Sequence, residues 1–295
     1  MSSIAILTDS NCGITRKEAE PLGFHVLPMP FSIDGKDYLE EVDMNLDEFF
    51  DILAKNPAAK VATSQPSIEN LTGTWDALLK EYDEIVHIPM SSGLSSSCQT
   101  ATMLAREEYA GRVWVADSKR ISGSLRYSCL EAVQQVKNGL TGEQVRDWLE
   151  ATGMDSSIYI TVATLSFLKK GGRLTPAVAA IGSLLKLKPV LQIQGAKLDT
   201  YKKPRTMAQA KKFMTEAIKD DMKNRFGNEI NLDVIHSANL EMAKEFRKET
   251  FENFPEVPGM RERDVVINPL SISVSCHIGP GSLAYTCSKV HPEIW

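Results

Sequence analysis

Residues 84–97 read EIVHIPMSSGLSSS, and this stretch decides the fold. EIVHIP is a short apolar run with β-branched residues, which is typical of a buried strand. The residues that follow, SSSCQTATMLAREEY (95–109), repeat apolar side chains at helical spacing. A serine-rich turn therefore connects a strand to a helix, which is the repeating unit of an α/β protein.

The same unit recurs on both sides of this stretch. Near-continuous apolar strands alternating with amphipathic helices predict a parallel sheet covered on both faces, and we assign this α/β/α domain to residues 1–150. The expected strands are IAILTD (4–9), HVLPMPFSI (25–33) and VWVAD (113–117). The expected helices are NLDEFFDILA (45–54), SIENLTGTWDALLKEY (67–82) and GSLRYSCLEAVQQVK (123–137).

After Gly153, strands and helices follow in mixed order, which predicts a smaller α+β domain over residues 151–295. The segment VVINPLSISVSCHIGPG (265–281) is expected to form one or two strands, and residues 175–185 an apolar, buried helix. The other expected elements are a hairpin at 192–201 with Gly195 in its turn, a helix at 206–226, a strand at 231–237 and a helix at 239–254.

Composition narrows the class of protein. The chain has 295 residues, more than one core usually organises, and a formal net charge of -5, which disfavours nucleic acid as a partner. Its five scattered cysteines do not form a disulfide pattern and fit a reducing compartment. The longest apolar stretch, AVAAIGSLLKLKPVLQI (177–193), is broken by two lysines and a proline, and no signal peptide is recognisable. We expect a cytoplasmic protein without stable membrane insertion.

Polar residues gather where three of the expected strands end. Asp9 with Ser10, the serines of 91–95, and Asp117 with Ser118 each follow an apolar run. In open α/β sheets, ligands bind at this edge. Capping of the next helix explains single Asp and Ser residues equally well.

The serine turn comes close to the G-x-S-x-G turn of a nucleophilic serine, but Ser97 stands where that motif has its second glycine. A nucleophilic Ser95 would need a base, and His277, expected at a strand end before a Gly-Pro-Gly turn, is the best candidate. A helix cap and a passive anion site are the alternatives.

Other motifs have simple structural explanations. Pro66 and Ser67 begin a helix, whereas Thr63 and Ser64 before them are left as candidate ligand donors. KKGGR (169–173) lacks P-loop spacing, and its glycines suit a helix C-cap. A Rossmann fingerprint is also missing from the sequence. Cys276 and His277, if on a strand, would point to opposite faces, which argues against a metal site.

Several stretches together resemble the DegV family of bacterial fatty-acid-binding proteins. They occur in the same order and spacing through the whole chain, so that the set is far more specific than any one motif. The stretches are IAILTDS (4–10), TSQPS (63–67), SSGLS (91–95), DS (117–118), LKKGGRL (168–174), GSLLKLKPVL (182–191), KPRT (203–206) and HIGPG (277–281).

The resemblance implies two domains with a long-chain fatty acid, such as palmitate, stearate or oleate, in a buried tunnel between them. It implies that Thr63, Ser95 and His277 hold the carboxylate, and Ser64 and Ser92 are further hydroxyl candidates. It also implies a non-catalytic carrier without a cofactor or an ATP site. A separate ATP-binding subunit of fatty acid kinase would then convert the bound acid to an acyl phosphate.

The resemblance makes Arg173 and Arg205 candidates for contact with the phosphate or for the docking face. The chain departs from the family pattern at residues 96–98, where it has Ser-Ser-Cys, and at Ile278, where the family commonly has threonine. Two other functions stay open. One is a serine hydrolase that uses Ser95 and His277, and the other is a small-ketone-binding protein related to the substrate subunit of dihydroxyacetone kinase.

Overall fold

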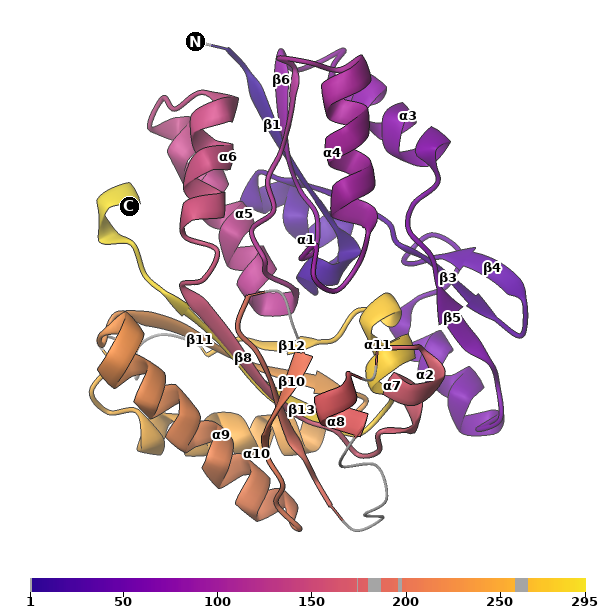
Figure 1. The fold of residues 1–295 in the computed structure, drawn as a ribbon, viewed down its shortest axis with the longest axis vertical. Coiled ribbons are helices and arrows are strands. Elements are labelled where there is room, and N and C mark those ends of the chain that lie inside the picture. Colours follow the sequence, from indigo (N-terminus) through magenta and orange to yellow (C-terminus); the bar gives the residue numbers. More distant parts are fainter. Residues whose placement is uncertain (1, 174, 180–186, 196–197, 258–264) are drawn as a thin grey trace.

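A computed structural model describes residues 2–173, 175–179, 187–195, 198–257 and 265–295. Figure 1 shows a parallel sheet with its helices in the upper half and a second, larger sheet in the lower half. The α/β architecture expected from the sequence is confirmed. In the part of the chain that the structure describes, no helix is long and apolar enough to cross a membrane.

The upper sheet has the order β2-β1-β6-β7, and all of its pairs are parallel. Apolar side chains alternate between its two faces, so one core packs against α5 and α6 and the other against α3 and α4. The strands are β1 (Ile4–Asp9), β2 (His25–Leu27), β6 (Glu84–Ile88) and β7 (Val113–Val115). The helices are α3 (Ile68–Leu78), α4 (Ser97–Glu108), α5 (Ser122–Lys137) and α6 (Gly142–Ala151), with the short α1 (Arg16–Ala19) after β1.

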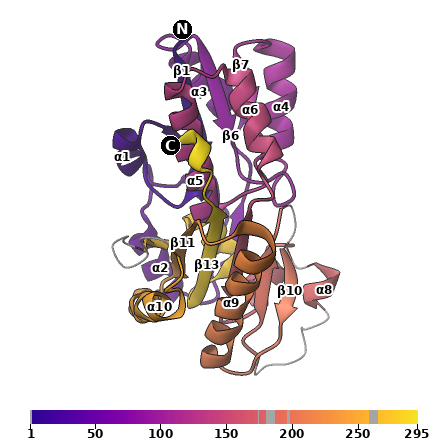
Figure 2. The ribbon, with the colours of Figure 1, turned by 90° about the vertical axis from the view of Figure 1, so that its left-hand side faces the viewer.

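The lower sheet is mixed, in the order β10-β9-β8-β13-β11-β12. The helices α9 and α10 cover its outer face, which Figure 2 shows from the side, and the other face looks toward the upper half. The strands are β8 (Ser156–Thr161), β9 (Val190–Ile193), β10 (Leu198–Lys202), β11 (Ile230–Ser237), β12 (Ile267–Pro269) and β13 (Ser282–Lys289). The helices are α9 (Met207–Asp221), continued by a π-turn at Met222–Phe226, and α10 (Leu240–Asn253).

Several local predictions are confirmed. Ser67 caps α3 as expected, and the helix expected from about residue 206 begins there, with Thr206 as its cap; each side chain accepts a hydrogen bond from a backbone N–H of the first turn. The short helix α7 (Ser166–Lys170) ends at Gly171, and Gly172 has a φ of 69°. β9 and β10 pair as the expected hairpin, although residues 196–197 of its turn lie outside the described residues. Of the expected helix at 175–185, only α8 (Pro176–Ala179) is described.

A third sheet was not expected. The predicted strand at 25–33 is wrong as a single element, because it divides at Pro28 into β2 and β3 (Pro30–Ile33). Prolines lack the N–H that a continuous strand would need, so the chain leaves the parallel sheet there. β3 pairs with β4 (Lys36–Leu39) and β5 (Val61–Thr63), and α2 (Leu46–Lys55) packs beside them.

Of the one or two strands expected over 265–281, one is present, but the expectation that His277 lies at a strand end is wrong. Only β12 is a strand, and Ile272–Ile278 form the helix α11, so His277 lies in the last turn of a helix. The alternating pattern SISVSC has strand periodicity, but Ser271 caps the first turn by accepting from the Val274 N–H. Helix α11 packs with β3 and α2 through Ile272 and Cys276. The argument that Cys276 and His277 would point to opposite faces of a strand therefore does not apply. Among the described residues, no cluster of His, Cys, Asp or Glu could hold a metal ion.

Candidate functional site

A cavity of about 620 Å³ lies between the upper and lower halves. Its wall is mainly apolar and comes from the lower sheet, from the end of β5, from α11 and from the loops after β1, β6 and β7. The residues with apolar side chains are Met29, Met90, Leu94, Ile121, Ile158, Ile160, Leu168, Ile193, Leu198, Ile235, Leu270, Val274, Ile278 and Ala284. A cavity with such walls is suited to a long apolar ligand.

One end of the cavity is polar because β5 and α11 meet there. Thr63 is the last residue of β5, and His277 projects from the last turn of α11. The Thr63 Oγ1 and the His277 Nε2 share a hydrogen bond of 2.8 Å, although 214 residues separate them in the sequence. Both residues line the cavity. The structure thus brings together two of the three residues expected to hold a carboxylate.

His277 is poised as a neutral ring. Burial, with the nearby positive charge of Arg173, lowers the pKa of its imidazole to about 4. Its Nδ1 is buried and has no hydrogen-bond partner within the described chain. A neutral imidazole offers one donor and one acceptor, so it can take part in the hydrogen bonding of a polar ligand group at this end without carrying a charge.

Serines of the two hydroxyl-rich segments also line the cavity. They are Ser64, Ser95 and Ser96. Ser95 also accepts a hydrogen bond from the Ser97 N–H at 3.2 Å, so it caps the start of α4. The capping role and the ligand-facing position coexist in one residue.

The geometry does not meet the needs of a nucleophilic Ser95. In the described structure, the one hydrogen bond of the His277 ring is to Thr63, and no carboxylate orients its Nδ1. A nucleophile needs a base in reach and a third group to hold that base. Ser95 is also absent from the residues with a strained positive φ, whereas a nucleophile elbow is a strained turn.

Two expected site residues lie elsewhere. Ser92 Oγ donates to the Asp117 carboxylate at 2.5 Å, which ties the serine turn to the loop after β7. Arg205 is exposed, and its backbone N–H donates to Gln209 Oε1 at the start of α9. Neither side chain is part of the cavity wall.

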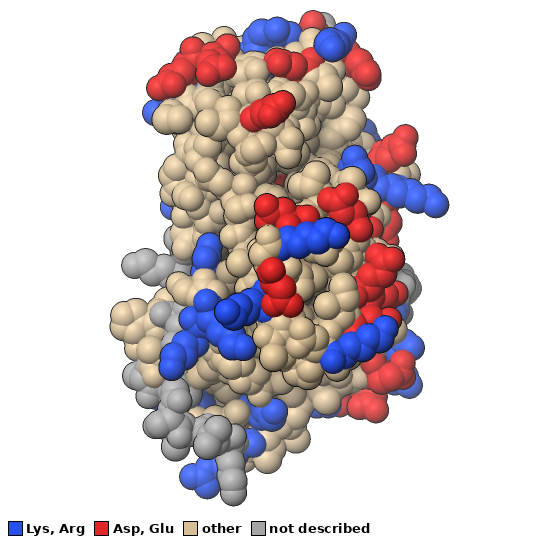
Figure 3. Space-filling view, turned by 90° about the vertical axis from the view of Figure 1, so that its right-hand side faces the viewer, with Lys and Arg blue, Asp and Glu red and all other residues tan. Residues whose placement is uncertain are grey.

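Arg173 is at the edge of the cavity and exposed to solvent. Its guanidinium donates to the Gly171 carbonyl at 2.9 Å, and the exposed Lys169 and Lys170 precede it on α7. Figure 3 shows the side of the molecule that is on the right in Figure 1, where Lys and Arg side chains occur together with Asp and Glu side chains. Arg173, Lys169 and Lys170 thus place three exposed cationic side chains on a segment that borders the cavity.

A buried carboxylate holds the helix that carries His277. Glu40 accepts hydrogen bonds from the Ile272 N–H at 2.5 Å and from the Ser10 hydroxyl at 2.7 Å. A negative charge is favourable at a helix N-terminus, while burial raises the pKa of this carboxyl to about 7. Ser273 on the same helix donates to Asn11 Oδ1. These contacts fix α11 to the loop after β1, and the sequence had not pointed to Glu40.

A sequence profile of the DegV family, described as a family of uncharacterised proteins, matches residues 3–290. The chain belongs to the DegV family. Among its curated relatives is a DegV domain-containing protein of Staphylococcus aureus, 28% identical over 290 residues that cover 98% of this chain and 100% of the relative. Protein DegV of Bacillus subtilis is 28% identical over 282 residues, covering 95% and 97% of the two chains.

Solved DegV structures share the whole fold. A DegV family protein from Thermus thermophilus, whose structure is titled for fatty acid binding, superposes with a TM-score of 0.86 at 27% identity and covers 98% of this chain and 100% of its own. DegV of Bacillus subtilis, called a fatty acid binding protein, gives a TM-score of 0.84 at 27% identity, with the same coverage. This DegV chain therefore shares the fold of these two proteins over nearly its whole length.

Proposed function

We propose that this DegV chain binds a long-chain fatty acid, such as palmitate, stearate or oleate, in the cavity between its two halves. The observation that carries the proposal is an apolar cavity of about 620 Å³ with the Thr63–His277 pair at one end. Structural relatives at 27% identity, from Thermus thermophilus and Bacillus subtilis, are described as fatty acid binding. The carboxylate would lie at the polar end and the acyl chain along the isoleucine-rich wall.

The head group would be held by hydroxyls and a histidine. Thr63, Ser64 and Ser95 offer O–H donors, and His277 offers a ring nitrogen. A buried carboxylate must be hydrogen-bonded, and its negative charge would raise the pKa of the neighbouring imidazole. Each buried CH2 contributes about 0.8 kcal/mol, so the tail supplies most of the affinity and the head group fixes orientation.

We further propose that the bound carboxylate is presented to a separate ATP-binding kinase subunit. A carboxylate oxygen would attack the γ-phosphorus, the bond to the β-phosphate oxygen would break, and acyl phosphate and ADP would form. The chain would act as a carrier and not as the catalyst. Arg173, exposed at the polar end, would meet the phosphate or the docked subunit, and Arg205 stays a candidate for the docking face alone.

The alternatives have less support. A hydrolase lacks the hydrogen bond from Ser95 to a base, as described above. A small ketone would fill little of a cavity of about 620 Å³.

Native mass spectrometry of delipidated protein, mixed with palmitate, stearate and oleate in turn, tests the first proposal. We expect a one-to-one complex with at least one of the three acids, and weaker retention after His277→Ala. A protein that retains none of them would refute fatty acid binding. Covalent labelling of Ser95 by a fluorophosphonate probe would instead support the hydrolase.

A further inference from the structure

The floor of the cavity includes β13, one of the two central strands of the lower sheet. Ala284 stands between Ile160 of β8 and Ile235 of β11 in the register of the sheet. All three line the cavity. A small residue between two larger ones leaves room above the strand, and we call this space the groove.

The groove leads away from the Thr63–His277 end. β13 begins at Ser282, a few residues after His277 and its Gly-Pro-Gly turn. Two residues beyond Ala284 on the same face is Thr286, which also lines the cavity. At about 3.4 Å per residue, Thr286 is about 14 Å along the strand from Ser282. Thr286 therefore marks the far end of the groove.

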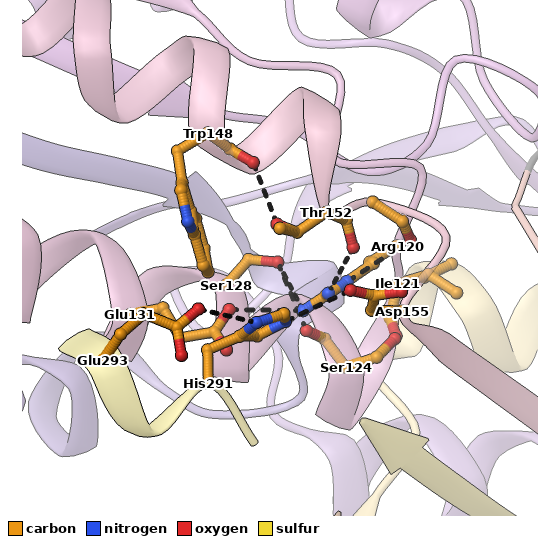
Figure 4. Close-up of polar contacts among 11 residues, drawn as sticks. Arg120, Ile121, Ser124, Ser128, Glu131, Trp148, Thr152, Asp155, His291 and Glu293 are labelled. Atoms are coloured by element: carbon orange, nitrogen blue, oxygen red, sulfur yellow. Dashed lines mark hydrogen bonds and ion pairs between the residues drawn. The ribbon is translucent and has the colours of Figure 1, made fainter. Parts of the chain in front are cut away.

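The first turn of α5 closes this far end. A Cβ added to Gly123 would lie 2.5 Å from the Thr286 Oγ1 and 2.6 Å from an Asp233 carboxylate oxygen, so the helix start rests directly on β13 and β11. Arg120 anchors the residues before the helix, because its guanidinium donates to the Thr152 carbonyl at 2.8 Å and pairs with Glu131 (Figure 4). The far end is rigidly built.

Ser122 gives this end an unused hydroxyl. It lines the cavity, only 4% of its surface is exposed, and its Oγ has no hydrogen-bond partner in the described structure. Its φ of 57° is in the left-handed region, which is costly for a residue other than glycine. The side chain of Ile121, the N-cap residue, cannot cap the first turn of α5. By contrast, Ser124 donates to the Ile121 carbonyl, as Figure 4 shows.

Thr286 is the second hydroxyl at this end. It is 1% exposed, and its Oγ1 has no hydrogen-bond partner in the described structure. Burial raises the pKa of the neighbouring Asp233 carboxyl, and the nearby Thr286 hydroxyl lowers it. Arg126 pairs with the Asp233 carboxylate at 2.9 Å. The buried and unpartnered Thr286 Oγ1 can accept a hydrogen bond from a ligand group.

We propose that Ser122 and Thr286 form a second polar subsite, which receives a hydroxyl group on the acyl chain of the ligand. The preferred ligand class is then a monohydroxy long-chain fatty acid. The ligand O–H would donate to Thr286 Oγ1 and accept from Ser122 Oγ, whereas a keto group could only accept. This inference rests on the proposed fatty acid function and extends it to the choice of acyl chain.

Competition calorimetry with delipidated protein provides the test. The probes are octadecanoic acid and a positional series of monohydroxy-octadecanoic acids, with the oxo acid that matches the best isomer. We expect one positional isomer to bind about tenfold more tightly than its neighbours, which corresponds to about 1.4 kcal/mol. Thr286→Val, which keeps the side-chain shape, and Ser122→Gly, which also tolerates the positive φ, should each remove most of that preference while leaving octadecanoic acid bound.

Ser288→Ala is the matched control. Ser288 is on the same strand, is equally buried and has an unpartnered hydroxyl, but it is not part of the cavity wall. The preference should survive this change. If octadecanoic acid binds but all isomers bind with similar or lower affinity, the subsite proposal is overturned and the hydroxyls serve at most a buried water. If octadecanoic acid itself does not bind, the proposed function fails instead.

Discussion

Gly171 packs against His277 so closely that a Cβ at position 171 would overlap the imidazole Nδ1. The backbone at Gly171 has an ordinary helical φ of -77°, so glycine is needed there for space and not for backbone conformation. The KKGGR segment therefore shapes the polar end of the cavity through its first glycine. Its arginine, Arg173, adds positive charge beside the same ring.

Gly171→Ala should displace His277 and weaken fatty acid binding. A methyl group would push the ring off Thr63 or force α7 outward, and we expect affinity for palmitate to fall by about tenfold or more, consistent with the loss of one to two hydrogen bonds in a buried site. Gly73→Ala, on α3 with nothing within 4 Å of the new Cβ, is the control. Equal palmitate affinity in both variants would show that the close approach has no role in binding.

Ser95→Ala should weaken carboxylate binding by about 1–3 kcal/mol, because it leaves a buried acceptor without a donor. Isothermal titration with oleate measures the change, and thermal unfolding separates it from the loss of the α4 cap. Ser92→Ala is the contrast, since Ser92 faces Asp117 outside the cavity and should leave oleate affinity unchanged. The reverse ranking of the two variants would move the head group to the other side of the serine turn.

The parallel sheet was predictable because its strands are short apolar runs separated by amphipathic helices. Helix α11 was not predictable, because SISVSC alternates apolar and polar residues as a strand does. The helix is stabilised by the tertiary packing of Ile272 and Cys276, which the local sequence does not show. Glu40 was missed because it stands in an acidic stretch, DYLEEVD, that reads as solvent-exposed. The chain gives no local sign that its carboxylate caps a helix 232 residues away.

The candidate site was predictable in part, and the resemblance to a family did most of that work. Periodicity and spacing alone do not place Thr63 against His277, because the contact joins a small sheet and a helix that were both missing from the expected elements. The same resemblance suggested Ser92 and Arg205, which the structure places away from the cavity. The subsite at Ser122 and Thr286 depends on an unpaired hydroxyl and on strand register, which sequence cannot show.

Glu40→Gln should change how stability depends on pH. Burial raises the pKa of Glu40 from 4.5 to about 7, so between these values the folded chain retains a proton that the unfolded chain has lost. The contribution of Glu40 to the free energy of unfolding is therefore greatest below pH 4.5. It falls as the pH rises from 4.5 to about 7, and it does not change further above that pH. The loss is on the order of 3 kcal/mol.

Urea unfolding at several pH values checks this prediction. Asp9 and Glu131 also have raised pKa values, so the wild-type curve carries their slopes too, and the comparison is between the two proteins. The Glu40→Gln curve should be flatter across the window. Parallel curves would mean that Glu40 keeps its charge in the folded state through the Ile272 and Ser10 hydrogen bonds.

Arg173→Gln should separate binding from phosphorylation. The guanidinium is exposed, so solvent screens its attraction for the carboxylate, and we expect the affinity for palmitate to change by no more than about threefold. A developing phosphoryl charge at the same end would lose its cation, and acyl phosphate formation with the kinase subunit should slow by about tenfold or more. Removal of the positive charge should also move the pKa of His277 upward from about 4, which an NMR titration of the ligand-free protein would detect.

Arg106→Gln is the control, because Arg106 is exposed near the end of α4 that is remote from the serine turn. It should alter neither palmitate affinity nor the rate of acyl phosphate formation. If Arg173→Gln weakens palmitate binding as much as it slows phosphorylation, Arg173 is a ligand contact and the presentation of the carboxylate to a kinase loses its main structural support.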